Sequence, residues 1–568
     1  MLQSVVNCRS MSTGSTVSTA KPGVIHSHGG HVHGHDAHGF DLPPLPDSIE
    51  IFDTTLRDGS QQEGISLSVE DKVRVAEQLD HLGVTFIEGG WPGANPKDSE
   101  FFARAHRELV LSTSTLVAFG STRRPGTTAE ADEGLRTLVE ANTPVVCIVA
   151  KAWDRHVEDA LRTSLDEAVA MVADSVDFLQ ANGKRVFVDL EHFFDGYLHN
   201  ADFAARVARE AENHGAERLV LCDTNGGTLP DRLTLVVNDL VRASTVGIGI
   251  HCHNDAGVAV ANSLAAVGAG AVQVQGCVNG YGERAGNTDL TAAIANLSLK
   301  LNITTVPRQN LERLTSVSHH IAELVNITPN PQQPYVGPSV FAHKGGLHAS
   351  AVARRRDLYE HVDPSLVGNA MRVVVSEMAG RSTLSMKADE LGLTLDPSIL
   401  GQILEDLKEL EYQGYHFEVA DGSLELLLRR ATGWKPDFFH VESFRVITDH
   451  HDGHHGGDVV TEATVKVEVG GERVSATAEG NGPVNALDAA LRRAIEPTYP
   501  GLSSVKLKDY RVRVVDTGQG TGAVTRVLID SGSEGLNWTT IGVSENIIEA
   551  SWQALYDSMV YALLHAAK

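Results

Sequence analysis

The feature that most limits how this chain can fold is a series of eight short apolar runs, separated by amphipathic stretches, between residues 49 and 276. The runs are 49–54, 84–89, 115–119, 145–150, 186–191, 219–223, 247–252 and 271–276. Apolar runs that alternate with helices are typical of a parallel sheet covered by helices. Eight such units predict an α/β fold, a (β/α)8 TIM barrel. A doubly wound open sheet is the alternative, but candidate polar residues follow several different strands, as barrel active sites require.

The rest of the chain differs from this region in composition. Residues 1–46 are rich in Ser, Thr, Gly, Pro and His without hydrophobic periodicity, which predicts a disordered tail. The barrel is predicted over 47–305 and small helical linker subdomains over 306–434, with helices near 310–326, 387–394 and 397–412. Residues 435–568 predict a C-terminal α+β domain. Its expected strands are 438–447, 459–469, 472–479, 509–517 and 524–530, and its expected helices are 484–496 and 543–566.

Two histidine clusters lie outside the barrel. The tail carries His26, His28, His31, His33, His35 and His38, and a later loop carries His450, His451, His454 and His455. Such tracts can bind transition metals, but an incidental flexible tail is the favoured interpretation. The alternative to an enzyme is a metal-handling protein built around the histidine tract, in which the barrel is an inactive scaffold.

Charge and hydropathy exclude several classes of protein. The formal net charge is −26, from 47 basic and 73 acidic side chains, which argues against partners such as nucleic acid or an anionic membrane surface. No stretch approaches the roughly 20 apolar residues of a membrane span, and the N-terminus lacks a secretory pattern. Four of the five cysteines lie in apolar runs, which predicts buried, reduced thiols. We therefore expect a cytoplasmic protein.

Three segments at the ends of predicted strands carry candidate metal ligands. Asp58 follows the first strand, and His251 and His253 end the seventh, where alternation places both imidazoles on one face. Asn287 lies in a glycine-rich loop after the eighth strand. This mixed nitrogen and oxygen set suits Mg²⁺, Mn²⁺ or Zn²⁺ with open coordination positions.

A cation of this kind predicts chemistry next to a carbonyl group. It can chelate the carboxylate and ketone oxygens of a 2-oxo acid and polarise the ketone for attack by a carbon nucleophile. Arg57 is placed to stabilise an enolate or alkoxide. Glu191 and Thr224, which end the fifth and sixth strands, also face the predicted barrel mouth. The sequence thus predicts an active site that forms or breaks carbon–carbon bonds.

Several motifs occur in a specific order: DTTLRDG (53–59), HCHND (251–255), GYGERAGN (280–287), FAHKGGLH (341–348), GRSTL (380–384) and EGNGPVNAL (479–487). Together they resemble the Claisen-condensing family that includes 2-isopropylmalate, homocitrate and citramalate synthases. The resemblance runs from about residue 47 to the end and implies acetyl-CoA as co-substrate. It implies metal ligands Asp58, His251, His253 and Asn287, catalytic residues Arg57 and Glu191, substrate contacts at Arg57, Glu191 and Thr224, and proton transfer by His348 with Tyr359. His343 is the nearby competitor of His348.

The segments around residues 88–98, 191–197 and 223–228 resemble the citramalate-forming branch, which implies pyruvate as the acceptor and a place in isoleucine biosynthesis. Trp91 or Phe193 is expected to narrow the acceptor pocket so that a methyl group fits and an isopropyl group does not. The C-terminal domain resembles an allosteric domain, which implies isoleucine as a feedback inhibitor, and the family resemblance implies a homodimer. The alternatives are a 2-isopropylmalate synthase acting on 2-oxoisovalerate and a related metal-dependent barrel lyase.

Overall fold

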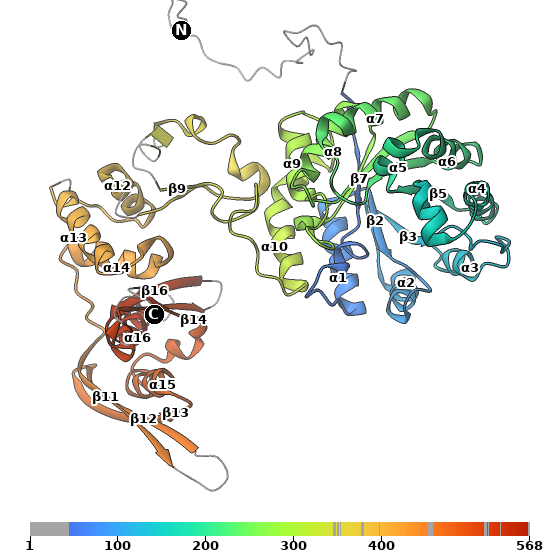
Figure 1. The fold of residues 1–568 in the computed structure, drawn as a ribbon. Coiled ribbons are helices and arrows are strands. Elements are labelled where there is room, and N and C mark those ends of the chain that lie inside the picture. Colours follow the sequence, from blue (N-terminus) through green and yellow to red (C-terminus); the bar gives the residue numbers. More distant parts are fainter. Residues whose placement is uncertain are drawn as a thin grey trace, which may run out of the picture.

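A computed structural model describes residues 45–344, 348, 351–352, 354–375, 380–396, 398–451, 458–515, 520, 522–533 and 536–565. The N-terminal half is a closed barrel of parallel strands in the order β1 to β8, and β8 pairs with β1 to close it (Figure 1). The strands are β1 (Glu50–Asp53), β2 (Phe86–Gly90), β3 (Thr115–Ser121), β4 (Val145–Lys151), β5 (Arg185–Glu191), β6 (Arg218–Asp223), β7 (Gly247–Cys252) and β8 (Gln273–Gly276). Each predicted apolar run overlaps one of these strands, with ends that differ by at most two residues, so the barrel prediction is confirmed.

Helices cover the outside of the barrel. They are α1 (Val69–Leu82), α2 (Pro96–Glu108), α3 (Glu133–Glu140), α4 (Leu165–Ala181), α5 (Phe193–His199), α6 (Ala201–Asn213), α7 (Pro230–Ala243), α8 (Ala259–Gly268) and α9 (Leu290–Leu299). Local sequence sets their ends, as α1 shows: Ser68 and Asp71 form a reciprocal capping box at its start, and Gly83, at φ 92°, ends it in the left-handed conformation.

Aromatic side chains fill part of the barrel interior. Phe52, Phe86 and Phe187, from β1, β2 and β5, are buried and pack with ring centroids 5.1–6.2 Å apart. Phe119 and Trp91 belong to the same apolar cluster. This packed interior gives the polar residues at the carboxyl ends of the strands a rigid base.

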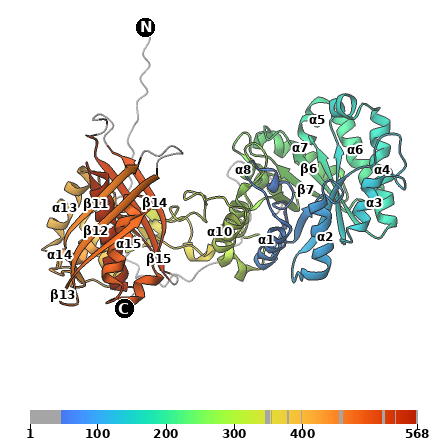
Figure 2. The same cartoon turned by 90° about the horizontal axis from the view of Figure 1, so that it is seen from below.

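The segment after β8 first completes the barrel core and then leads away from it. The predicted helix near 310–326 is observed as the 3₁₀ turn Arg308–Arg313 and helix α10 (Leu314–Leu324), and α10 packs against α1. Leu314, Ile321 and Val367 belong to the barrel's hydrophobic core. Figure 2 shows the following residues between the barrel and the C-terminal region.

The remaining linker elements are β9 (Ala342–His343), β10 (Arg372–Val373), α12 (Arg381–Glu390), α13 (Leu400–Tyr412) and α14 (Asp421–Ala431). The prediction of a helix over 387–394 is displaced, because Gly392 adopts φ 67° just after α12 ends. Helix α13 confirms the prediction over 397–412, whereas α14 was not predicted.

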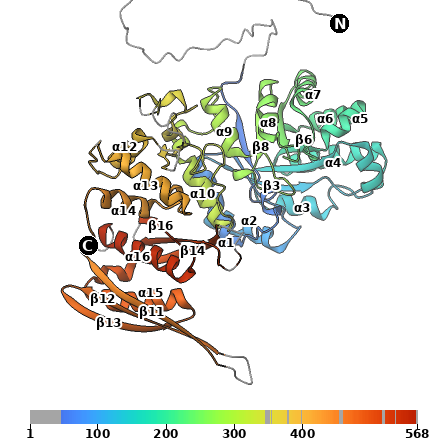
Figure 3. The ribbon, with the colours of Figure 1, turned by 60° about the vertical axis from the view of Figure 1, so that its left-hand side comes forward.

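The C-terminal region contains two antiparallel three-stranded sheets, each followed by a helix (Figure 3). The first has β11 (Phe439–His451), β12 (Asp458–Val469), β13 (Glu472–Gly480) and α15 (Pro483–Ile495). The second has β14 (Lys506–Val514), β15 (Thr525–Ser533), β16 (Leu536–Ser544) and α16 (Ile547–His565). Strand β16 was not predicted. The α+β prediction is confirmed, and the two-fold repeat of the sheet-and-helix unit is an added finding.

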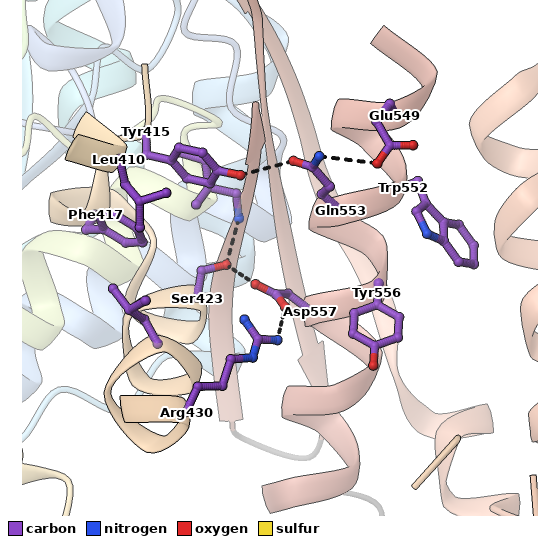
Figure 4. A pocket seen from close by; sticks show the side chains of 12 residues that line it. Leu410, Tyr415, Phe417, Ser423, Arg430, Glu549, Trp552, Gln553, Tyr556 and Asp557 are labelled. Carbon is purple, nitrogen blue, oxygen red and sulfur yellow. Dashed lines mark hydrogen bonds and ion pairs between the residues drawn. The ribbon is translucent and has the colours of Figure 1, made fainter. Parts of the chain in front are cut away.

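Helix α14 joins the linker to this region. Its apolar face shares a core with Ile541 of β16 and with residues of α13. A cavity of about 400 Å³ lies between the linker and α16, and most of its polar side chains are hydrogen-bonded to one another (Figure 4). Asp557 of α16 accepts from Arg430 at 2.7 Å and from Ser423 at 2.8 Å.

Two of the sequence predictions cannot be compared with the fold. The histidine tract of the tail and His454 and His455 of the later loop lie outside the described residues. Among the residues that are described, no helix is long and apolar enough to cross a membrane.

A candidate metal-binding active site in the barrel mouth

Four predicted metal ligands converge where the barrel strands end. The Asp58 carboxylate lies 3.2 Å from Nε2 of His251 and 3.8 Å from Nε2 of His253. His253 forms a backbone bridge with Asn287, which brings the glycine-rich loop to the same place. All four side chains are buried. The structure therefore groups residues as far apart in sequence as Asp58 and Asn287.

The backbone of the glycine-rich loop passes close to the Asn287 side chain, which only a residue without a Cβ atom allows. Gly282 adopts φ 143°, and a Cβ atom at this position would collide with the Asn287 amide nitrogen. Asn287 donates from Nδ2 to the Tyr281 carbonyl at 3.1 Å. Its Oδ1 is consequently directed away from that bond and is left available as an acceptor.

The donor set fits a divalent cation. Asn287 Oδ1 and His253 Nδ1 are buried and have no hydrogen-bond partner in the described part of the chain, and buried polar atoms without partners are unusual in proteins. The Asp58, His251 and His253 donor atoms lie within 4.8 Å of one another. One carboxylate, two imidazoles and an amide oxygen suit Mn²⁺, Mg²⁺ or Zn²⁺ with further positions open.

The charges of the site are strongly coupled. Burial by itself would raise the pKa of Asp58, but Arg57, His251 and His253 together hold it well below its usual range. Burial, with a contribution from His251, lowers the pKa of His253 to about 4. The site therefore keeps one carboxylate ionised and one imidazole neutral at pH 7, which are the forms that ligate metals.

Arg57 is fixed in place on three sides. Its Nε donates to Glu88 Oε2 at 2.5 Å, its Nη1 lies 3.5 Å from Asp58, and its guanidinium stacks over the Phe119 ring at 3.9 Å. Burial opposes the charge, but Glu88, Asp58 and Asp189 outweigh burial and raise the pKa of Arg57. Arg57 thus supplies a permanent, immobile positive charge beside the candidate metal site.

These residues open into a cavity of about 430 Å³. Its lining comprises Arg57, Asp58, Gln61, Trp91, Phe119, Ser121, Thr122, Arg123, Arg124, Pro125, Val149, Lys151, Leu161, Met171, Asp189, Glu191, Cys222, Thr224, His251, His253, Glu283 and Arg284. A space of this size and mixed lining is typical of small-molecule sites. Of the predicted site residues, Arg57, Asp58, Trp91, Glu191, Thr224, His251 and His253 line it.

Two of the predicted substrate contacts are held by neighbouring side chains. Glu191 pairs with Lys151 of the adjacent strand β4. Thr224 accepts from the His192 backbone at 2.9 Å through its hydroxyl, while its carbonyl accepts from Arg284 at 2.7 Å. Of the two aromatic residues predicted to narrow the pocket, Trp91 packs edge-on against Phe119 at the cavity, whereas Phe193 is fully buried against Tyr197 and does not line it.

The predicted proton-transfer residues lie elsewhere. His348 and Tyr359 stack on each other with ring centroids 4.2 Å apart, on the linker that follows the barrel. Neither side chain lines the barrel cavity. Their competitor His343 is buried in β9, with its Nε2 3.5 Å from Glu360. The structure shows that His348 and Tyr359 are in contact, and their catalytic role stays a prediction.

Several polar residues around the site were not assigned a role from the sequence. Glu88 holds Arg57, Lys151 holds Glu191, and Asp189 and Gln275 contact one another inside the barrel. Alternation contained a signal for Asp189, because it lies two positions before Glu191 on the same strand and so faces the same way.

Three protein-family models match consecutive parts of the chain. Residues 48–321 match the HMGL-like family model, 335–414 the homocitrate synthase post-HMGL domain-like model, and 418–563 the LeuA allosteric (dimerisation) domain model. The (R)-citramalate synthase of Streptomyces coelicolor is 53% identical over 92% of this chain and 98% of its own. That of Geobacter sulfurreducens is 49% identical over 91% and 97%. A probable 2-isopropylmalate synthase of Methanopyrus kandleri is 34% identical over 90% and 97%.

Proposed function

The chain belongs to the family of the (R)-citramalate synthases, and from this premise we propose that it condenses acetyl-CoA with pyruvate to give (R)-citramalate and free CoA. The observation that carries the proposal is the grouping of Asp58, His251, His253 and Asn287 beside Arg57 at the barrel cavity. The alternative acceptor, 2-oxoisovalerate, is less well supported, because the 2-isopropylmalate synthases that match this chain are 30–34% identical to it, against 43–53% for five of the (R)-citramalate synthases.

The chain's own residues define what happens to the substrates. A divalent cation bound by the four ligands would act as a Lewis acid toward the ketone of pyruvate. In this proposal Arg57 stabilises the negative charge that develops on the enolate or alkoxide oxygen, and its contacts with Glu88, Asp58 and Phe119 already hold it in position before the reaction. Glu191 and Thr224, which also line the cavity, orient the acceptor, and Lys151 holds the Glu191 carboxylate.

The cavity also supports a preference for a small acceptor. Trp91 and Phe119 form an apolar wall, with ring centroids 5.4 Å apart, on the side of the cavity where Arg57 lies. A methyl group next to this wall leaves more free space than an isopropyl group. Steric selection of this kind is worth roughly 10–200-fold for each extra methylene, so turnover of 2-oxobutanoate is expected beside that of pyruvate.

Proton transfer is assigned to His348 and Tyr359, which the family resemblance implies and which are in contact with each other. Because neither side chain lines the barrel cavity, this role requires the linker, from the same chain or from a second copy, to approach the barrel mouth during the reaction.

We further propose that the enzyme is a cytosolic homodimer inhibited by isoleucine, the end product of the pathway that citramalate supplies. The LeuA allosteric (dimerisation) model matches residues 418–563, and β14 exposes Leu507, Val512 and Val514, apolar side chains suited to contact with a second chain. The four described cysteines are free and buried, as expected in a reducing compartment. Asp557 of α16 is hydrogen-bonded to α14, and we propose that these bonds transmit the effect of the inhibitor from α16 to the linker (Figure 4).

The proposal is tested by product analysis with metal-depleted enzyme. Chelator-treated protein is incubated with acetyl-CoA and pyruvate, with and without Mn²⁺, and the product is identified by chiral chromatography. We expect (R)-citramalate only when Mn²⁺ is present, and none from Asp58→Asn. Absence of any condensation product from the metal-loaded enzyme would instead favour the lyase alternative.

A further inference from the structure

A chain of buried hydrogen bonds crosses the barrel interior behind the candidate metal site. Nδ1 of His251, on β7, lies 2.9 Å from Oε1 of Gln275, on the neighbouring strand β8. Nε2 of Gln275 donates to Oδ1 of Asp189, on β5, at 3.1 Å. All three side chains are buried. These hydrogen bonds therefore connect one candidate metal ligand to two residues that are not themselves candidate ligands.

The donors and acceptors that each side chain offers determine the direction of both hydrogen bonds. Oδ1 of Asp189 accepts from the NH₂ group of Gln275, which turns the oxygen end of this amide away from Asp189. The Gln275 carbonyl oxygen then faces His251, and because this oxygen can only accept a hydrogen bond, Nδ1 of His251 must be the donor. His251 is thereby held as the Nδ1–H tautomer, and its Nε2 lone pair is left free for a cation bound beside Asp58, whose carboxylate lies 3.2 Å away.

We propose that Gln275 and Asp189 are positioning residues that fix the tautomer and ring orientation of His251 for metal binding. The inference rests on the proposed metal-dependent function. It goes beyond that function by assigning two roles outside the ligand set. Partners of this kind usually change metal affinity or activity 10–100-fold when they are removed.

The barrel offers a matched control on the same strand. Gln273 lies two positions before Gln275, so its side chain points the same way, and it is equally buried. Its Nε2 donates to Glu50 at 3.0 Å rather than to a neighbour of the metal ligands. Gln273→Met therefore removes a buried amide of identical type without touching His251.

The experiment measures binding of Mn²⁺ alone to the metal-depleted full-length protein, by the electron paramagnetic resonance signal of free Mn²⁺. Gln275→Met should weaken Mn²⁺ binding at least about tenfold, whereas Gln273→Met should change it less than about threefold. Asp189→Asn keeps an acceptor oxygen and should stay near the wild type, while Asp189→Leu should follow Gln275→Met. Thermal unfolding and circular dichroism of each variant confirm that it is folded.

Equal Mn²⁺ affinity in Gln275→Met and Gln273→Met would overturn the proposal, and so would equal losses in Asp189→Asn and Asp189→Leu. If Gln275→Met does not fold, the comparison of the two Asp189 variants decides the question. Because no substrate is present, a failure of pyruvate condensation leaves this result intact, so the two proposals fail independently. Wild-type protein that binds no Mn²⁺ would contradict both.

Discussion

The pair formed by Arg57 and Glu88 gives the sharpest energetic prediction. Glu88 is fully buried and accepts from Arg57 Nε at 2.5 Å. Removing one partner of a buried ion pair usually costs about 3–5 kcal/mol, because the other charge is left uncompensated. Asp58, 3.5 Å from Arg57, compensates part of that charge, so we expect Glu88→Gln to lose about 3 kcal/mol, near the lower end of this range.

The control is an exposed pair of similar geometry. On the barrel surface, Arg104 donates to Glu108 at 2.7 Å, and an exposed pair of this kind contributes little to stability because water screens both charges. The variants Glu88→Gln and Glu108→Gln are each compared with the wild type by urea unfolding at about pH 8. This pH is needed because burial raises the pKa of Glu88, and its carboxyl must be ionised for the comparison. We also expect Glu88→Gln to lower kcat about 100-fold or more, since Arg57 loses the contact that fixes it. Equal destabilisation by Glu88→Gln and Glu108→Gln would refute the reasoning.

Three further predictions follow from other parts of the molecule. Burial raises the pKa of Asp53 to about 7 despite hydrogen bonds from Thr55. Between pH 3.8 and about 7 the folded state therefore binds more protons than the unfolded state, and its stability falls as the pH rises. Asp53→Asn should flatten that decline, measured by urea unfolding at about pH 5 and about pH 8. Arg124 lines the cavity without an ion-pair partner among the described residues. Arg124→Gln should therefore raise KM for acetyl-CoA about tenfold but not KM for S-acetyl-pantetheine, which lacks the nucleotide phosphates, and Arg136→Gln on α3, outside the cavity, should change neither. Asp557→Asn should leave basal activity unchanged and raise the isoleucine concentration for half inhibition several-fold, because it weakens the bonds to Arg430 and Ser423; an unchanged value would exclude this route of coupling.

The barrel strands could be predicted because each is a nearly continuous apolar run, and parallel strands buried on both faces require such runs. The same-face histidines followed from strand alternation alone. By contrast, β16 was missed because its sequence, LNWTTIGVS, mixes polar threonines with glycine and depends on pairing with β15 for its conformation. Helix α14 was missed for a related reason: its apolar face is specified by contact with Ile541, far away in sequence.

Part of the site could also be predicted from the sequence. Asp58, His251 and His253 stand at strand ends, where a barrel gathers its functional residues. Glu88 and Gln275 are polar residues inside strands, and only the closed barrel shows that they meet Arg57 and His251. The position of His348 and Tyr359 outside the cavity likewise depends on the path of the linker, which has no periodic pattern from which it could be read.

The most direct test of the central claim is a competition between acceptors in one reaction. Metal-loaded enzyme receives acetyl-CoA with equal concentrations of pyruvate and 2-oxoisovalerate, and the two condensation products are quantified by mass spectrometry. The cavity wall formed by Trp91 and Phe119 predicts that citramalate exceeds 2-isopropylmalate by roughly 100-fold or more. A product mixture dominated by 2-isopropylmalate would leave the condensation chemistry intact and contradict the assignment of pyruvate as the acceptor.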